Sequence, residues 1–173
     1  MADERGLSSL TLSALATRLG VRQPSLYKHI ESLDGLQRSI SIQARRELGQ
    51  VLAGAAVGRS GPEAVRSLAV AYRHWVLEHP GRYAATVRAP DPDDEEDLRA
   101  SDDVVATVVA VLAAFELAGE AAIDAARALR SAIHGFVSLE TGGGFGLPRD
   151  LTTSFDFLVE TLVRGLGEDA PAG

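Results

Sequence analysis

A tight glycine turn between two short helical patterns constrains the fold of this chain more than any other feature. Four apolar residues within residues 11–20 follow the i, i+3, i+4, i+7 spacing of one helix face, namely Leu12, Leu15, Ala16 and Leu19. Thr11 stands in front of them as an N-cap candidate. Gly20 can adopt the positive φ that ends a helix, and Val21 after it can fold back onto the first helix. The pattern therefore predicts a helix that stops at this turn.

A second short helix is predicted after the turn, from about Gln23 to His29. Pro24 fits its first turn, where a backbone nitrogen has no intrahelical acceptor to lose. Leu26 and Ile30 are predicted to point inward. The side chains left to face a partner are Arg22, Gln23, Ser25, Tyr27 and Lys28. Such polar groups suit phosphate and base-edge contacts in a DNA major groove, although helix pairs with a glycine turn also occur in all-α proteins that never bind DNA.

The run GVRQPSLYKHI at residues 20–30, followed by LDGL at residues 33–36, resembles the DNA-binding domain of the TetR family of bacterial repressors. In that family a Gly-Val turn leads into a short recognition helix that ends in Leu-Tyr-x-His. The resemblance implies that Thr11 caps the preceding helix near a phosphate and that Tyr27 and Lys28 contact the DNA backbone. The candidate base readers that it implies are Arg22, Gln23 and Ser25, and His29 completes the DNA-binding set.

One position departs from the family pattern, and the charge of the chain is unevenly distributed. Most members carry a phosphate-binding lysine where Leu33 and Asp34 stand here; Asp34 suits the helix dipole but would repel DNA.

Residues 1–50 carry seven Lys/Arg against five Asp/Glu, and the remainder ten against nineteen, which gives +2 and −9 and a net charge of −7. A mildly basic head on an acidic body makes the attraction of phosphate local.

The length of 173 residues favours a small domain fused to a larger one. We expect an all-α chain with a helix-turn-helix DNA-binding domain at residues 1–50, in which Met1 to Gly6 form the last turn of a truncated first helix. Residues 51–173 are expected to form a helical ligand-sensing and dimerisation bundle. The lack of cysteine excludes disulfides and thiolate chemistry, and with no signal peptide and no membrane span we expect a cytoplasmic protein.

Apolar periodicity predicts further helices beyond the motif. They run from a Ser32 cap to about Val57, from Val65 to His79, through Tyr83 and Val87, from Val104 to Leu117, from Glu120 to Thr141 and from Leu151 to Leu166. The helix at 104–117 is apolar on nearly every side, which predicts burial at the centre of a bundle. The acidic stretch Ala89 to Asp97 is predicted to be a solvated loop.

The segment SAIHGFVSLETGGGFGLP at residues 131–148 resembles the WHG type of TetR-family C-terminal domain. The Trp-His-Gly triplet appears here as Ile133, His134 and Gly135, so the tryptophan is replaced. In that family the last two long helices pair with their copies across a two-fold axis, which implies a homodimer. The resemblance also implies an effector pocket, because aromatic groups and a histidine lie on helices expected to face one another. The pocket residues that we predict are Tyr72, Trp75, Phe115, His134 and Val137.

Other chemistry finds little support in the sequence. The glycines at 142, 143, 144 and 146 follow a predicted helix rather than a strand, so they do not form a dinucleotide-binding loop. His74 and His79 are five residues apart and off a common helix face, so we expect no metal. His134 has two interpretations, a hydrogen-bonded core residue or a polar anchor for a ligand. No catalytic motif is found, and we expect no enzyme and no cofactor.

The resemblance implies a transcription regulator, most simply a repressor, that is released from a pseudo-palindromic double-stranded DNA operator by an unknown small-molecule effector. The partners are then DNA, a second copy of the chain and the effector, and no membrane. The alternative interpretation is a helical dimerisation or interaction protein that has lost DNA binding, and salt-dependent DNA binding separates the two.

Overall fold

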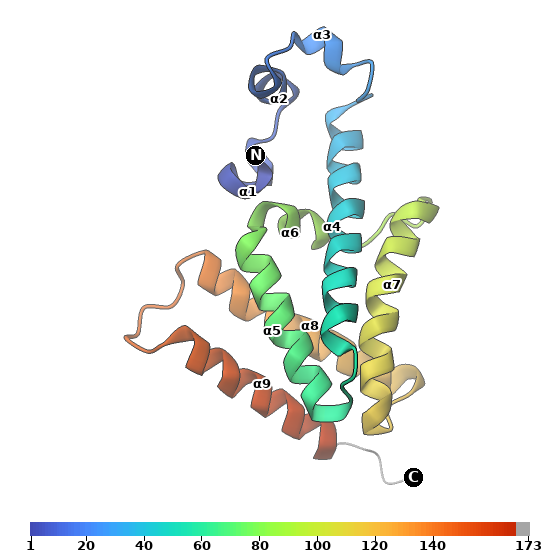
Figure 1. Cartoon of the computed structure of the whole chain (residues 1–173), viewed down its shortest axis with the longest axis vertical. Coiled ribbons are helices and arrows are strands. Elements are labelled where there is room, and N and C mark those ends of the chain that lie inside the picture. The colour runs from blue at the N-terminus through green and yellow to red at the C-terminus, as the bar shows by residue number, and fades with distance from the viewer. Residues whose placement is uncertain (169–173) are drawn as a thin grey trace. The chain divides into compact units, whose positions relative to one another are not determined.

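A computed structural model describes residues 1–168, and within that range the chain is helical and contains no strand (Figure 1). The helices in chain order are α1 (Ala2–Arg5), η1 (Leu7–Ser9), α2 (Leu12–Leu19), α3 (Gln23–Leu26), α4 (Leu33–Ala56), α5 (Gly61–Glu78), α6 (Pro80–Thr86), α7 (Glu95–Leu112), η2 (Ala113–Phe115), α8 (Gly119–Thr141) and α9 (Leu151–Glu168). The all-α prediction is confirmed.

The chain divides into two compact units. Unit 1 contains residues 1–47 and 78–102, and unit 2 contains residues 48–77 and the chain from residue 103 onward. Two helices, α4 and α7, therefore contribute to both units. The division of function at residue 50 stays a prediction.

Unit 1 is built from short helices with well-defined local stops. The hydroxyl of Ser32 accepts a hydrogen bond from the Gly35 N–H at 2.9 Å, which caps the start of α4 as its sequence predicts. α1 and η1 pack against α6. Few apolar side chains before α4 are buried, and these are Ala2, Leu10, Ala16 and Leu26. Packing in this part of the unit is correspondingly shallow, so its caps and polar contacts carry much of its structure.

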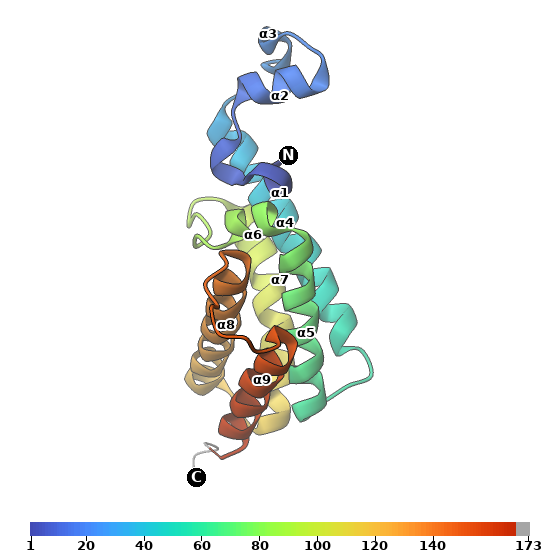
Figure 2. The ribbon, with the colours of Figure 1, turned by 90° about the vertical axis from the view of Figure 1, so that its left-hand side faces the viewer.

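The core of unit 2 lies on the apolar faces of α5, α8 and α9 and on the end of α7, and α8 packs against α9 (Figure 2). Its largest fully buried side chains are Phe155, Leu112, Val65, Val76 and Val137. The ring of Phe136 on α8 meets Phe155 edge-on, with centroids 5.1 Å apart. The guanidinium of Arg73 lies over both rings and forms two hydrogen bonds with Glu140, at 2.8 and 2.6 Å. Arg73 and Glu140 therefore form a polar boundary to a core that is otherwise apolar.

Two predictions about α7 and the stretch before it are wrong. The apolar run from Val104 onward is not buried on all sides, because Val105 is 49% exposed and only one face of the helix is covered within residues 1–168. The acidic stretch is not simply solvated either, because α7 begins at Glu95 and the side chain of Asp97 is 7% exposed.

Residues 1–168 contain no single helix that is long and apolar enough to cross a membrane. One pair of helices, α7 with η2 and then α8, is long and apolar enough when taken together, but it is bent by 111°.

Candidate nucleic-acid interface

The turn between α2 and α3 is fixed by local hydrogen bonds that the sequence predicts. The Thr11 hydroxyl accepts from the Ala14 N–H at 3.1 Å, and Gly20 adopts the left-handed conformation with φ 67° and ψ 25°. The Val21 N–H donates to the Ala16 carbonyl at 3.0 Å. Two apolar side chains predicted to pack here are not covered, because Leu19 is 59% and Val21 43% exposed.

The second helix is shorter than predicted. α3 spans only Gln23–Leu26 and does not reach His29. The N–H of His29 bonds to the Leu26 carbonyl, three residues back, at 2.9 Å, so the chain tightens into turns where the helix was expected to continue. Leu26 is 5% exposed and anchors the segment, as predicted.

The structure leaves all seven predicted DNA-binding side chains exposed. They are Thr11, Arg22, Gln23, Ser25, Tyr27, Lys28 and His29. They come from the N-caps of α2 and α3, from α3 itself and from the turns after α3 (Figure 1). Within residues 1–168 neither Arg22 nor Lys28 forms an ion pair, so both cations are available to phosphate without first losing a carboxylate partner.

Several other arginines of unit 1, among them Arg18, Arg38, Arg45 and Arg46, are paired with carboxylates. Arg18 on α2 holds Glu4 through two hydrogen bonds of 2.6 and 2.7 Å. Hydrogen bonding to Arg18 lowers the pKa of Glu4, and the carboxylate in turn raises the pKa of Arg18. A basic side chain on α2 is therefore already neutralised within the unit.

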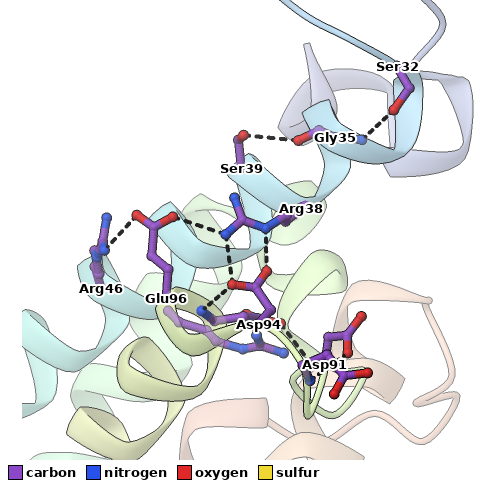
Figure 3. Close-up of polar contacts among 11 residues, drawn as sticks. Ser32, Gly35, Arg38, Ser39, Arg46, Asp91, Asp94 and Glu96 are labelled. Carbon is purple, nitrogen blue, oxygen red and sulfur yellow. Dashed lines mark hydrogen bonds and ion pairs between the residues drawn. The ribbon is translucent and has the colours of Figure 1, made fainter.

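A larger group of ion pairs, which we call the α4–α7 cluster, joins Arg38, Arg45 and Arg46 of α4 to Asp94, Glu96 and Asp97. Arg38 binds Asp94 in a two-pronged contact and reaches Glu96 at 3.1 Å, and Arg46 binds the other oxygen of Glu96 at 2.9 Å (Figure 3). The hydrogen bond from Arg38 lowers the pKa of Asp94, and those from Arg46 and Arg38 lower the pKa of Glu96. Sequence reasoning missed this cluster.

The buried member of the α4–α7 cluster is the pair between Arg45 and Asp97, whose side chains are 6% and 7% exposed. Arg45 also donates to the carbonyl of Arg88 at 2.6 Å, and the second oxygen of Asp97 accepts from the Asp91 N–H at 3.1 Å. Both charges are therefore compensated by hydrogen bonds as well as by each other. The spacing of three arginines at i, i+7 and i+8 on one helix was the available signal.

The five predicted effector residues all belong to unit 2. Trp75 and Tyr72 lie in the apolar face of α5, 4% and 8% exposed, and Val137 on α8 is fully buried. His134 is partly exposed, with Nδ1 3.4 Å from the Ser138 hydroxyl, and Phe115 lies in η2. An open hollow of about 450 Å³ elsewhere in the unit runs along the outer face of α5, lined by Arg59, Glu63, Arg66, Ser67, Val70, Ala71 and His74.

Residues 65–162 match the family model described as "Tetracyclin repressor-like, C-terminal domain". The chain is 44% identical over 142 residues to the uncharacterized HTH-type transcriptional regulator Rv0681 of Mycobacterium tuberculosis; the match covers 82% of this chain but spans only 65% of that relative's length. It is 34% identical over 168 residues to the uncharacterized HTH-type transcriptional regulator YobS of Bacillus subtilis, covering 96% of this chain and 86% of that protein.

Solved structures show the same fold. TetR from Acinetobacter baumannii superposes with a TM-score of 0.68 at 19% identity, covering 96% of this chain and 91% of that one. A variant of that protein in complex with minocycline gives a TM-score of 0.71 at 21% identity, covering 96% and 90%.

Proposed function

Because the chain belongs to the tetracycline repressor-like (TetR) family of helix-turn-helix transcriptional regulators, we propose that it is a homodimeric repressor released from a pseudo-palindromic operator by a small molecule. Proteins of this family bind DNA operators and respond to small-molecule effectors. The observation that carries the proposal is the exposed polar surface of α3 and of the residues that flank it, where Arg22 and Lys28 have no carboxylate partner within residues 1–168.

In this proposal α3 enters the major groove. Arg22, Gln23 and Ser25 read base edges, because their positions at the start of the helix face outward and the buried Leu26 fixes the helix from behind. The phosphate contacts come from the cap and the turns, namely Thr11, Tyr27, Lys28 and His29.

A dimer is supported by apolar side chains that unit 2 leaves uncovered on and between α8 and α9. Phe157 is 70%, Leu139 50% and Ile123 47% exposed, and Leu147 in the connection is 84% exposed. We take these side chains to belong to one interaction surface, because large exposed apolar patches mark such surfaces. Two copies related by a two-fold axis would present mirrored α3 helices, so the operator would be a pseudo-palindrome. We assign residues 51–173 to this dimerisation and sensing domain, of the WHG type.

The proposed effector site lies in the same domain, with Tyr72, Trp75, Phe115, His134 and Val137 as its lining. The support is a buried tryptophan and tyrosine on α5 and a partly exposed histidine on α8, an apolar wall with few polar anchors. Release from DNA requires the effector to bind the DNA-free conformation more tightly, since equal affinity for both conformations shifts nothing.

The test is in vitro selection from random double-stranded DNA, followed by salt titration of the selected site. A repressor of this type selects two inverted half-sites and binds them more weakly as salt rises. A single asymmetric half-site would contradict the dimer on DNA. Selection of no sequence, from a chain that is still dimeric, would favour the alternative of an interaction protein that has lost DNA binding.

The dimer surface can be tested with two matched substitutions. Phe157→Asp on α9 places a charge in the proposed interface and is expected to yield a monomer in analytical ultracentrifugation. Val105→Asp on α7 introduces the same charge at another exposed apolar side chain, 49% exposed, and it should leave the dimer intact. Equal effects of the two variants would remove α9 from the interface.

A further inference from the structure

Arg73 on α5 contacts both helices of the α8–α9 pair at once. Its guanidinium forms two hydrogen bonds with Glu140 near the end of α8, at 2.8 and 2.6 Å, and donates to the Thr152 hydroxyl at the start of α9 at 3.3 Å. The same group lies 5.8 Å from the ring centroid of Phe136 and 5.1 Å from that of Phe155, within the range of a cation–π contact. One arginine therefore holds the end of α8 and the start of α9 together.

α5 carries a second arginine that binds a carboxylate in the same way but in water. Arg66 forms a two-pronged contact with Glu160, well along α9, and these two side chains are 43% and 48% exposed. The side chains of Arg73 and Glu140 are 14% and 12% exposed, so solvent screens their attraction much less. The shielded pair is therefore expected to fix a geometry more strictly than the exposed one.

Residues 142–150, which we call the α8–α9 connection, join the two helix ends that Arg73 holds (Figure 1). Glycine occupies four of these nine positions, so a free segment of this composition would sample many conformations. The N–H groups of residues 142–144 donate instead to carbonyls at the end of α8, and the shortest bond runs from Gly144 to Leu139 at 2.7 Å. The connection is therefore ordered within a single chain.

Phe145 links the middle of the α8–α9 connection to the arginine. Its ring meets that of Phe136 with centroids 4.8 Å apart, and Phe136 is one of the two rings over which Arg73 lies. The connection also carries Leu147, which is 84% exposed and belongs to the surface proposed to meet a second copy. A side chain on a segment that is already ordered can be buried by a partner without the entropic cost of fixing the segment at that moment.

We propose that Arg73 is a positioning residue for the dimer, and that it orders the α8–α9 connection before a second copy of the chain binds. This role rests on the proposed homodimer and adds to it a residue outside the apolar surface that sets the strength of association. A contact that only stabilised unit 2 would act on all of its helices alike. The route through Phe136 and Phe145 instead makes the connection the part of the unit that depends most on Arg73.

The first test compares Arg73→Gln with Arg66→Gln in sedimentation equilibrium of the full chain. Each substitution removes one cation that joins α5 to a carboxylate. Arg73→Gln should raise the dissociation constant of the dimer by at least about tenfold, because the connection must then be ordered at the moment of association. Arg66→Gln should raise it by less than about threefold. Arg73→Lys, which keeps a cation but loses the two-pronged contact, should lie between Arg73→Gln and the wild type.

A second measurement does not need a dimer. In the monomeric Phe157→Asp variant, hydrogen exchange is followed by mass spectrometry in residues 142–146 and, in the same sample, in α9 around the buried Val159. Adding Arg73→Gln should accelerate exchange in the connection by at least about tenfold and change it around Val159 by less than about twofold. Adding Arg66→Gln should change neither. Phe145→Ala removes the contact with Phe136 and should reproduce the pattern of Arg73→Gln.

The outcomes separate this role of Arg73 from the proposed homodimer. Equal dissociation constants for Arg73→Gln and Arg66→Gln would overturn it, and so would exchange that accelerates equally in the connection and around Val159, because Arg73 would then be a general structural contact. A wild type that stays monomeric would overturn the homodimer instead, and exchange in that monomer would still decide whether Arg73 orders the connection. Should Arg73→Gln fail to fold, Arg73→Lys and Phe145→Ala carry both measurements, and unchanged exchange in the connection of both would overturn the role.

Discussion

The two cations that flank α3, Arg22 and Lys28, belong to the same unit as three arginines of α4, yet the two groups differ in their partners. Within the described chain Arg22 and Lys28 are exposed and have no ion pair, whereas the arginines of α4 are tied to the acidic residues around the start of α7 (Figure 3). A count of charges treats the two groups alike. The structure shows that only the first group is available to a polyanion without losing an internal carboxylate.

This difference in pairing bears on the negative net charge, which is unexpected for a protein proposed to bind DNA. A net charge of −7 argues against binding DNA, and an excess of +2 over residues 1–50 is small. However, Arg38, Arg45 and Arg46 contribute to that excess while their partners Asp94, Glu96 and Asp97 fall outside the segment. The basic character of the head therefore comes from fewer side chains than the count suggests. Arg5, Arg22 and Lys28 form no ion pair within residues 1–168, and the last two of these flank α3.

The largest effect on stability is expected at the buried ion pair between Arg45 and Asp97. Asp97→Asn would remove the carboxylate charge that pairs with the enclosed Arg45, and we expect a loss of about 3 to 5 kcal/mol in the free energy of unfolding. Denaturant titration followed by circular dichroism measures it. Glu96→Gln removes the same charge from an exposed pair one residue away and should cost much less. If the two variants lost equal stability, burial would not distinguish the members of the α4–α7 cluster.

The next largest effect concerns base-pair preference, which the exposed residues at and around α3 are expected to set. Arg22→Ala and Gln23→Ala should each relax the preference for particular base pairs by about 1 to 3 kcal/mol if the contact is bidentate. Neither should change the denaturation midpoint, because both side chains are exposed. Binding-site selection repeated with each variant gives the measurement. Specificity profiles identical to that of the wild type would show that the base readers lie elsewhere.

Local interactions made much of this surface predictable from the sequence. Thr11, Gly20 and Ser32 cap or end helices through contacts within three or four residues, and all three behave as expected. The exposure of α3 followed from the spacing of Leu26 and Ile30. The early end of α3 was not predictable, because a four-residue helix is held by its surroundings and not by its own propensity.

Long-range contacts explain what the sequence could not predict. Asp97 stands in an acidic run that favours a solvated loop, but its partner Arg45 is 52 residues away, and no periodicity connects them. Val105 was expected to be buried because its neighbours are apolar, and half of it is exposed within the described chain. Gly81 attracts no notice in the sequence, yet a Cβ atom at this position would lie 2.0 Å from the Ala2 carbonyl oxygen and 2.6 Å from the Asp3 nitrogen, on the distant helix α1.

Salt dependence gives a smaller effect that compares the two groups of cations directly. Lys28→Ala should weaken binding to all DNA sequences about equally and reduce the slope of log affinity against log salt by about 0.9, the value for one lost phosphate contact. Arg38→Ala should leave that slope unchanged, because its guanidinium is already held by Asp94 and Glu96. Equal slopes for the two variants would mean that pairing within unit 1 does not decide which cations meet DNA.

The smallest effect should appear as acid removes the exposed pairs of the α4–α7 cluster. The pKa of Asp94 lies below its ordinary 3.8 and that of Glu96 below its ordinary 4.5, because Arg38 and Arg46 bind the charged forms. Each carboxylate therefore contributes stability above its ordinary pKa, and that contribution is lost as the pH falls through its lowered value in the folded state.

Denaturation midpoints measured from pH 7 to pH 3 test this sign. The gap in stability between wild type and Asp94→Asn should be constant near neutrality and close only below about pH 4. It should also shrink at high salt, because Arg38 is exposed. Asp93→Asn removes a neighbouring carboxylate that forms no ion pair within residues 1–168 and should show no such gap. A gap for Asp94→Asn that widened as the pH fell would mean that Arg38 does not favour the charged carboxylate. The exposed pair of Arg38 and Asp94 would then no longer support the contrast between paired and unpaired cations.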